Sequence, residues 1–192
     1  MTTRGINDFV FRGLLAKHTV RDLEARGILR ASHHREDERH EVDLYAPLPD
    51  RVRESSQQMQ RCYRILYAIE NLVRDFVKDT LSEKDKDKWF EKRASTTMRK
   101  KVADRKAAEV KNQWHAGRNE GDEFYLDFGD LGLLIINHWE VFADLVPDQV
   151  WVTSRMQEAE RSRHVIAHTN VLPIEEGNRL EQILRDWIRQ LG

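Results

Sequence analysis

The clearest pattern of hydrophobic and polar positions begins just after two prolines, Pro47 and Pro49. From about Arg51, apolar side chains recur at the i, i+3, i+4, i+7 spacing that places them on one face of an α-helix. This apolar stripe consists of Met59, Cys62, Tyr63, Leu66, Ile69, Val73, Phe76 and Val77. The spacing predicts a long amphipathic helix at the start of a main domain that covers residues 51–192.

Further helices are predicted downstream. Residues 131–146 are apolar on nearly all sides, which is typical of a central buried helix. Pro147 and Asp148 start the next helix, which runs towards His168, and Pro173 ends the connection after it. The last helix carries an apolar face made of Leu180, Ile183, Leu184, Trp187, Ile188 and Leu191. Four or five helices with short connections, and a loop at 117–121, predict an all-α helical bundle.

Residues 1–50 have a different pattern. Segments 9–16 and 20–25 are typical of two short helices that end at Gly27. Segments 28–32 and 41–45 flank a polar stretch, as in a short β-hairpin. We therefore expect a small N-terminal α/β appendage with a regulatory or docking role. DNA binding by this appendage, in a transcriptional regulator, is an alternative, although the segment contains no complete helix-turn-helix.

Composition narrows the class of protein. The 192-residue chain is 40% hydrophobic and 34% charged, which suits a globular domain with a highly charged surface. Its one cysteine excludes an intramolecular disulfide and favours a reducing compartment. No apolar run reaches the roughly 18 residues that a membrane span needs. We expect a cytoplasmic protein without a membrane segment.

Charge is distributed unevenly although the formal net charge is −1. Residues 82–118 hold twelve Lys and Arg against six Asp and Glu, with Trp89 and Trp114 near the ends of the segment. Cations with interspersed aromatics can bind single-stranded RNA through phosphate contacts and base stacking. The RNA-binding candidates are Lys100, Lys101, Arg105 and Lys106. A solvated helix face explains such a run of charges equally well.

The segment 160–168 reads Glu-Arg-Ser-Arg-His-Val-Ile-Ala-His and contains the strongest candidates for chemistry. Its Arg163 and His168 are five residues apart, which separates them by about 140° on an ideal helix. They can share one cleft if the arginine reaches round the helix or if the helix ends near His168. The polar residues and the proline that follow His168 favour such an end.

This pair of residue types suits RNA cleavage without a metal, in which the 2′-hydroxyl is the internal nucleophile. A histidine with a near-neutral pKa can move the proton of that hydroxyl. A guanidinium can hold the phosphate and offset its developing charge. The structural alternative is a helix terminus at which His168 interacts with the helix dipole and Arg163 is solvated.

Glu70 is a second candidate because it falls on the apolar stripe, where a carboxylate needs a partner. That partner is either Arg74, four residues on, or a functional group such as Arg163 or a catalytic histidine. His164 and His168 share a helix face and can ligate zinc, but no further ligand lies at a familiar spacing. We therefore expect no metal and no cofactor, and a solvated loop for the histidines and acids of residues 33–40.

Several segments in their order resemble the HEPN superfamily. Residues 163–168, Arg-His-Val-Ile-Ala-His, are similar to its signature of an arginine, a polar residue, a few further residues and a histidine. Residues 63–74 resemble the first helix of the Swt-type branch, and Trp89 with the basic helix after it resembles the variable second region. Residues 127–131 and 137–142 resemble the third helix. The resemblance covers about residues 51–192.

The resemblance implies a HEPN-type helical bundle that forms a homodimer, with the motif helices of two subunits facing a shared cleft. It implies a metal-independent endoribonuclease, a toxin of a toxin–antitoxin pair or an effector of abortive infection and antiviral defence, with an antitoxin or defence protein as partner. Arg163 and His168 would be the catalytic pair, with His164 at the polar motif position and Glu70 at the acidic position of the first helix. A non-catalytic HEPN adaptor that binds RNA, nucleotide or protein is the alternative.

Overall fold

A computed structural model of the chain describes residues 44–112, 114 and 116–191. Within these ranges the regular structure is helical and no strand occurs, so the predicted all-α class is confirmed for this part of the chain. The chain divides into two units, residues 1–53 and 54–192, and the second unit carries the features discussed below. The two short helices predicted for 9–16 and 20–25, the hairpin up to residue 43 and the histidine-rich segment 33–40 lie outside the described residues. Residues 44 and 45, predicted as the end of the second hairpin strand, are helical.

The helices follow one another with short connections, apart from the segment between α5 and α6. Within the described ranges they are α3 (Asp50–Asp85), η1 (Lys86–Lys88), α4 (Trp89–Arg93), α5 (Thr96–Lys111), η2 (Asp122–Tyr125), α6 (Phe128–Asn137), α7 (Trp139–Phe142), α8 (Gln149–Ala167) and α9 (Ile174–Leu191). Five of these have ten or more residues, in agreement with the predicted number of long helices.

Helix α3 is the long amphipathic helix predicted from the apolar stripe. Most of the predicted stripe is buried, and the buried members are Cys62, Leu66, Ile69, Val73 and Val77. Met59 and Phe76 are half-buried at its margin. Tyr63 was wrongly assigned to the stripe, because 58% of it is exposed. Tyr63 follows Cys62 directly and is therefore turned about 100° away from it around the helix axis.

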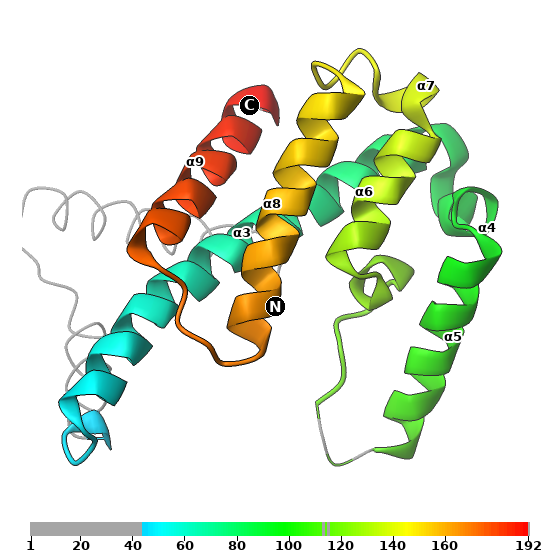
Figure 1. Cartoon of the computed structure of the whole chain (residues 1–192). Coiled ribbons are helices and arrows are strands. Elements are labelled where there is room, and N and C mark those ends of the chain that lie inside the picture. Colours follow the sequence, from blue (N-terminus) through cyan, green and yellow to red (C-terminus); the bar gives the residue numbers. More distant parts are fainter. Residues whose placement is uncertain (1–43, 113, 115, 192) are drawn as a thin grey trace, which may run out of the picture. The chain divides into compact units, whose positions relative to one another are not determined.

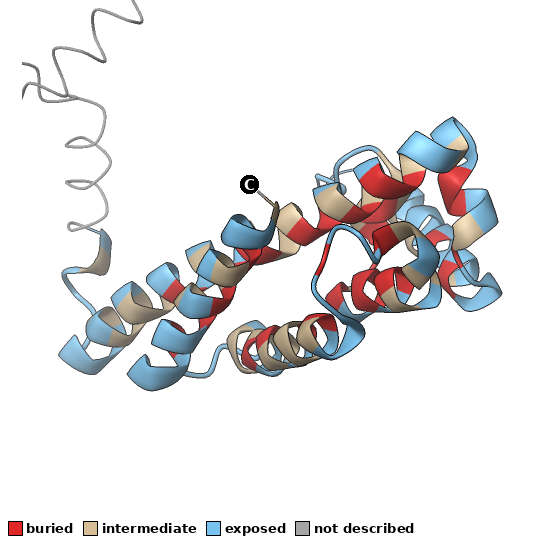
Figure 2. Cartoon of the chain, turned by 90° about the horizontal axis from the view of Figure 1, so that it is seen from above, coloured by how far each residue is buried: buried red, intermediate tan, exposed pale blue. Residues whose placement is uncertain are grey.

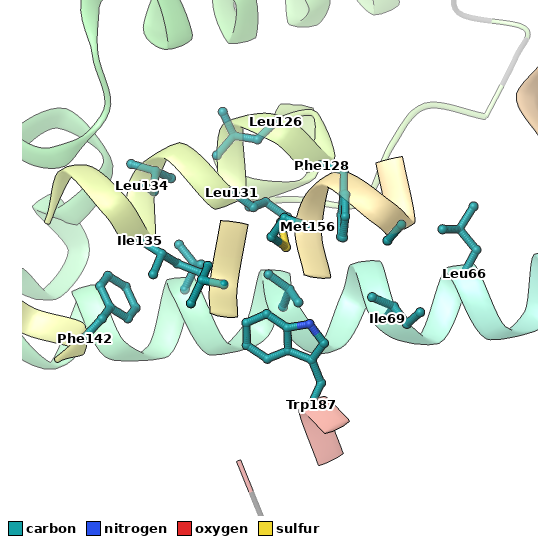
Figure 3. Close-up of a cluster of buried hydrophobic side chains, with 14 of the residues drawn as sticks. Leu66, Ile69, Leu126, Phe128, Leu131, Leu134, Ile135, Phe142, Met156 and Trp187 are labelled. Atoms are coloured by element: carbon teal, nitrogen blue, oxygen red, sulfur yellow. The ribbon is translucent and has the colours of Figure 1, made fainter. Parts of the chain in front are cut away.

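The core lies where α3 crosses the other long helices. Helix α8 packs between α6 and α9, and α3 passes behind α8 and α6 in the view of Figure 1. The buried residues lie on the helix sides that face one another, as Figure 2 shows. The fully buried Trp187 of α9 lies near α3 in Figure 3, with its ring centroid 4.9 Å from that of Trp151 and 6.1 Å from that of Phe76.

The single buried helix predicted for residues 131–146 is wrong, because α6 ends at Asn137 and the short α7 follows. His138 lies between them with φ −119° and ψ 36°, outside the helical region. Its imidazole Nε2 donates to the carbonyl oxygen of Arg93 at 2.8 Å, which holds the ring against the end of α4. The interruption of the helix thus coincides with a contact between distant segments.

The boundaries predicted for α8 and α9 are confirmed. The Asp148 carboxylate caps the start of α8 by accepting a hydrogen bond from the Trp151 N–H at 2.7 Å, and α9 begins directly after Pro173. The predicted apolar face of α9 is buried or half-buried except for Ile188, which is 54% exposed. No helix in the described part of the chain combines the length and the apolar composition required to span a membrane.

Helix α8 ends at Ala167, with His168 as its C-cap residue, as the sequence predicts. Two hydrogen bonds close this end: the Thr169 N–H donates to the Ile166 carbonyl at 3.0 Å, and the Asn170 N–H donates to the Val165 carbonyl at 3.1 Å. This is the Schellman arrangement, in which the residue after the cap adopts a left-handed conformation. Thr169 adopts it with φ 55°, a position that usually favours glycine.

Candidate active site

A cleft of about 600 Å³ opens between α3, α8 and the segment that precedes α6. Its walls bring together residues that lie far apart in the sequence, including the predicted site residues Glu70 and Arg163. The other lining residues are Tyr63, Leu66, Tyr67, Asn71, Arg74, Gly117, Arg118, Asn119, Phe124, Ile166 and Ala167. The charged groups in this set are three arginines and one glutamate, and each of the arginines pairs with a glutamate of the chain.

Glu70 forms the intrahelical pair with Arg74, one of the two alternatives that the sequence leaves open. Its Oε1 accepts a hydrogen bond from Arg74 Nη2 at 2.5 Å. Arg74 is buried, and its Nε also donates to the backbone carbonyl of Glu123 at 3.2 Å. Its guanidinium carbon lies 5.4 Å from the ring centroid of Phe124. The Glu70–Arg74 pair therefore holds the segment around η2 against α3, in addition to lining the cleft.

Arg163 belongs to α8, is half-buried and lines the side of the cleft that this helix forms. Glu160 orients it, with Oε2 accepting from Arg163 Nε at 3.1 Å and Oε1 accepting from Nη2 at 3.3 Å. Burial opposes the charged form of Arg163, but the hydrogen bond and charge of Glu160, with the charges of Glu70 and Asp127, outweigh it and raise its pKa. The guanidinium is thus a fixed cation that is electrostatically coupled to Glu70 across the cleft.

The predicted site histidines occupy different positions. His164 is exposed, and its Nε2 lies 3.2 Å from Glu160 Oε1, so the same glutamate serves both motif residues Arg163 and His164. His168 is exposed at the C-cap of α8 and is not among the residues that line the cleft, although Ala167 is. Because α8 stays helical to Ala167, the end of the helix does not bring His168 into the same cleft as Arg163.

The basic segment is largely paired within the chain. Lys101 Nζ lies 2.7 Å from Asp130 Oδ2, Arg105 Nη2 lies 2.8 Å from Asp127 Oδ1, and Lys106 Nζ lies 2.5 Å from Asp122 Oδ1. Three of the four RNA-binding candidates therefore neutralise acids that precede or begin α6. Lys100, the fourth, is exposed. Trp89 is buried in the core, whereas Trp114 is 95% exposed, so only the second of the two tryptophans is available to a ligand.

These ion pairs give α5 a structural function. Arg105 Nη1 donates to the Tyr125 carbonyl at 2.6 Å, and the Tyr125 hydroxyl donates to Glu109 at 2.8 Å. Glu109 also pairs with Arg118, which lines the cleft. Helix α5 buries just two side chains, Met98 and Val102. The ion pairs and hydrogen bonds of its charged side chains therefore hold the cleft wall formed by residues 117–124 in place.

We expect the Asp127→Asn substitution to lower stability at neutral pH and to have little effect in acid. Burial alone would raise the Asp127 pKa, but hydrogen bonds from Lys101 and Arg105 lower it below the ordinary value. A lowered pKa stabilises the folded state above the unfolded value of about 3.9, and this contribution is lost as pH falls through the folded value. Asparagine remains a good N-cap for α6, so the substitution tests the charge.

Urea unfolding at pH 7 and pH 3 measures this effect. The expected loss at pH 7 is about 0.5–1 kcal/mol, the range for partly exposed ion pairs. An equal loss at both pH values would contradict an origin in the carboxylate charge. The matched control is Asp144→Asn, because Asp144 is exposed between α7 and α8.

Sequence reasoning missed the aromatic residues that line the cleft. Tyr63 and Tyr67 are four residues apart on α3, and Glu70 and Arg74 continue the same face of the helix. That spacing is visible in the sequence and marks a polar and aromatic face beside the apolar stripe. Arg118 and Phe124 carried no such signal, because they reach the cleft through the long-range contacts of α5.

The described residues contain no group of three or more His, Cys, Asp or Glu side chains that could hold a metal ion. Comparison of the whole chain with protein-family models, with curated proteins and with solved structures returned no match.

Proposed function

We propose that this protein is a HEPN-type endoribonuclease that cleaves RNA without a metal ion. The observation that carries the proposal is the meeting of Glu70 and Arg163 in one cleft that three arginines line. A cleft with three arginines is suited to the phosphates of an RNA strand, because guanidinium groups bind phosphate oxygens in bidentate geometry. Glu160 and Glu70 hold two of these guanidinium groups in fixed positions.

In the proposed reaction the 2′-oxygen of RNA forms a bond to the adjacent phosphorus, and the bond from phosphorus to the 5′-oxygen breaks. Arg163 binds the phosphate and stabilises the charge that develops on its oxygens. His168 takes the proton of the 2′-hydroxyl, and the departing 5′-oxygen receives a proton from water or from a protonated histidine. The products are a 2′,3′-cyclic phosphate end and a 5′-hydroxyl end.

The proposal requires two subunits, because within one chain His168 does not line the cleft. In a symmetric dimer the same surface of both subunits meets, so the end of one α8 can face the other α8. Arg163 then acts with His168 of the partner subunit. Glu70 acts as a positioning residue through Arg74, and His164 acts through the Glu160 carboxylate that it shares with Arg163.

The biological role that fits such an enzyme is a cytoplasmic toxin or antiviral-defence effector, held inactive by an antitoxin or another defence protein. A second candidate function is a non-catalytic HEPN adaptor that binds RNA, nucleotide or a protein partner. The exposed position of His168 outside the cleft favours this second candidate. Both candidates use the same cleft and differ in whether a histidine reaches it.

Cleavage of total RNA and tRNA in EDTA by wild type, Arg163→Ala and His168→Ala separates the two candidates. We expect wild type to produce 2′,3′-cyclic phosphate ends and each variant to lose at least about a hundredfold in rate, because each removes a group that acts in the transition state. Arg161→Ala is the matched control, since Arg161 is an exposed arginine on the same helix. Equal cleavage by all four proteins, or none by wild type, would contradict the proposed enzyme.

A further inference from the structure

Two tyrosines on α3 line the cleft and remain largely exposed. Tyr63 and Tyr67 are each 58% exposed, and both line the cleft. Their ring centroids are 6.3 Å apart and their planes are inclined by 40°. The rings therefore lie next to each other one helical turn apart, and more than half of each residue stays exposed.

Hydrogen-bonded guanidinium groups surround the two rings. Asn71, one turn beyond Tyr67, donates from Nδ2 to the Tyr67 carbonyl at 2.8 Å and accepts at Oδ1 from Arg74 at 2.7 Å. The tyrosine face of the helix is thus tied to the buried guanidinium of Arg74. Arg163 and Arg118 lie on the other walls of the same cleft.

Aromatic rings beside arginines match the chemistry of single-stranded nucleic acid. Such a strand presents phosphates to the cations and the π-faces of its bases to the rings. In a duplex the neighbouring base pairs cover both faces of each base, so a paired base cannot stack on a protein side chain without leaving the helix. An apolar partner would account for the rings alone and would make no use of the guanidinium groups beside them.

We propose that Tyr63 and Tyr67 form a base-stacking platform that makes the cleft selective for unpaired nucleotides of single-stranded RNA. The base stacks on the tyrosines while a neighbouring phosphate lies at Arg163. The position of that phosphate rests on the proposed function, whereas the stacking depends on the tyrosine face and the guanidinium groups of the cleft. Tyr63 and Tyr67 are then specificity-determining residues and take no part in proton transfer.

The test is binding of a 2′-O-methyl RNA strand that carries one 2-aminopurine, because this strand cannot be cleaved through a 2′-hydroxyl. Experiments use the full chain in EDTA. We expect Tyr63→Ala and Tyr67→Ala each to weaken binding about five- to one-hundred-fold, the range for loss of one stacked base. Tyr63→Phe and Tyr67→Phe keep the ring and should bind like wild type. Stacking quenches 2-aminopurine fluorescence, so wild type and the Phe variants should quench it and the Ala variants should not.

Ile188→Ala is the matched control, since Ile188 is 54% exposed and does not line the cleft. Equal affinity of the Ala variants and wild type, equal affinity for an abasic strand, or equal affinity for a duplex of the same sequence would overturn the platform. Dissociation of a dimer by the Ala variants in sedimentation would also overturn it and assign the tyrosines to a subunit interface.

The two proposals fail in different ways. Tyrosine-dependent binding by a wild-type protein that does not cleave RNA would support the platform and contradict the ribonuclease. Cleavage that depends on Arg163 but is unaffected by both tyrosine-to-alanine substitutions would support the ribonuclease and contradict the platform.

Discussion

Mixing the Arg163→Ala and His168→Ala variants is expected to restore RNA cleavage that neither variant shows alone. The reason is geometric: Arg163 lines the cleft of its own subunit, and His168 lies outside that cleft at the end of α8. If each active site combines Arg163 of one subunit with His168 of the other, a mixed dimer contains one intact site and one site that lacks both groups. An active site built within one subunit could not be restored by mixing.

The expected recovery follows from random pairing of subunits. Half of the dimers in an equal mixture are mixed, and each has one intact site of two, so the rate should reach about a quarter of the wild-type rate. The matched control mixes His168→Ala with the double variant Arg163→Ala/His168→Ala, which assembles no intact site. Differently tagged subunits verify the exchange by mass. Absence of recovery after verified exchange would contradict the shared site.

Replacing Trp187 by alanine is expected to produce the largest loss of stability among single substitutions in the described core. Trp187 is fully buried and packs against Trp151 and Phe76. Removing a buried tryptophan side chain costs about 3–5 kcal/mol, through lost burial and the cavity that remains. The free energy of unfolding from urea denaturation, followed by circular dichroism, measures the effect.

Two variants test whether this loss comes from packing. Trp114→Ala removes a 95% exposed ring and should change the free energy of unfolding by no more than about 0.5 kcal/mol. Trp187→Phe should cost less than alanine, because it keeps an aromatic ring and removes an indole N–H that has no hydrogen-bond acceptor among the described residues. Equal losses for Trp187→Ala and Trp114→Ala would contradict the position of Trp187 in the core.

Local periodicity predicts the parts of the fold that depend on one helix at a time. The buried stripe from Cys62 to Val77 follows from the helical repeat, and the Glu70–Arg74 pair follows from the i, i+4 spacing. The start of α8 at Asp148 follows from the capping preference of aspartate. In each case the determining interaction lies within about one turn of the helix.

The features that sequence reasoning missed depend on contacts between distant segments. The break at His138 is accompanied by a hydrogen bond to the Arg93 carbonyl, which no local pattern announces. The ion pairs of the basic residues of α5 were not predicted, because their acidic partners, Asp122, Asp127 and Asp130, are separated from them by an intervening loop. The sequence contains both sets of charges, but their pairing is a property of the folded chain.

The candidate site likewise combines features that local spacing predicts with features that depend on the folded chain. The helical phase of α8 places Arg163 and His168 on different sides, as the spacing of five residues predicts. The left-handed Thr169 ends the helix without redirecting His168 into the cleft. The sequence therefore identifies Arg163 and His168 as candidates. The structure adds that Arg163 lines the cleft and that His168 lies outside it at the end of α8.

The ion pairs that attach α5 have a consequence for measurements of the proposed RNA binding. The slope of log K against log salt concentration is commonly converted into a number of phosphate contacts. Here added salt also screens the pairs that Lys101, Arg105 and Lys106 make with acids, and so loosens the wall that carries Arg118. The slope then contains a conformational contribution, and the number of phosphates derived from it exceeds the number that the cleft binds.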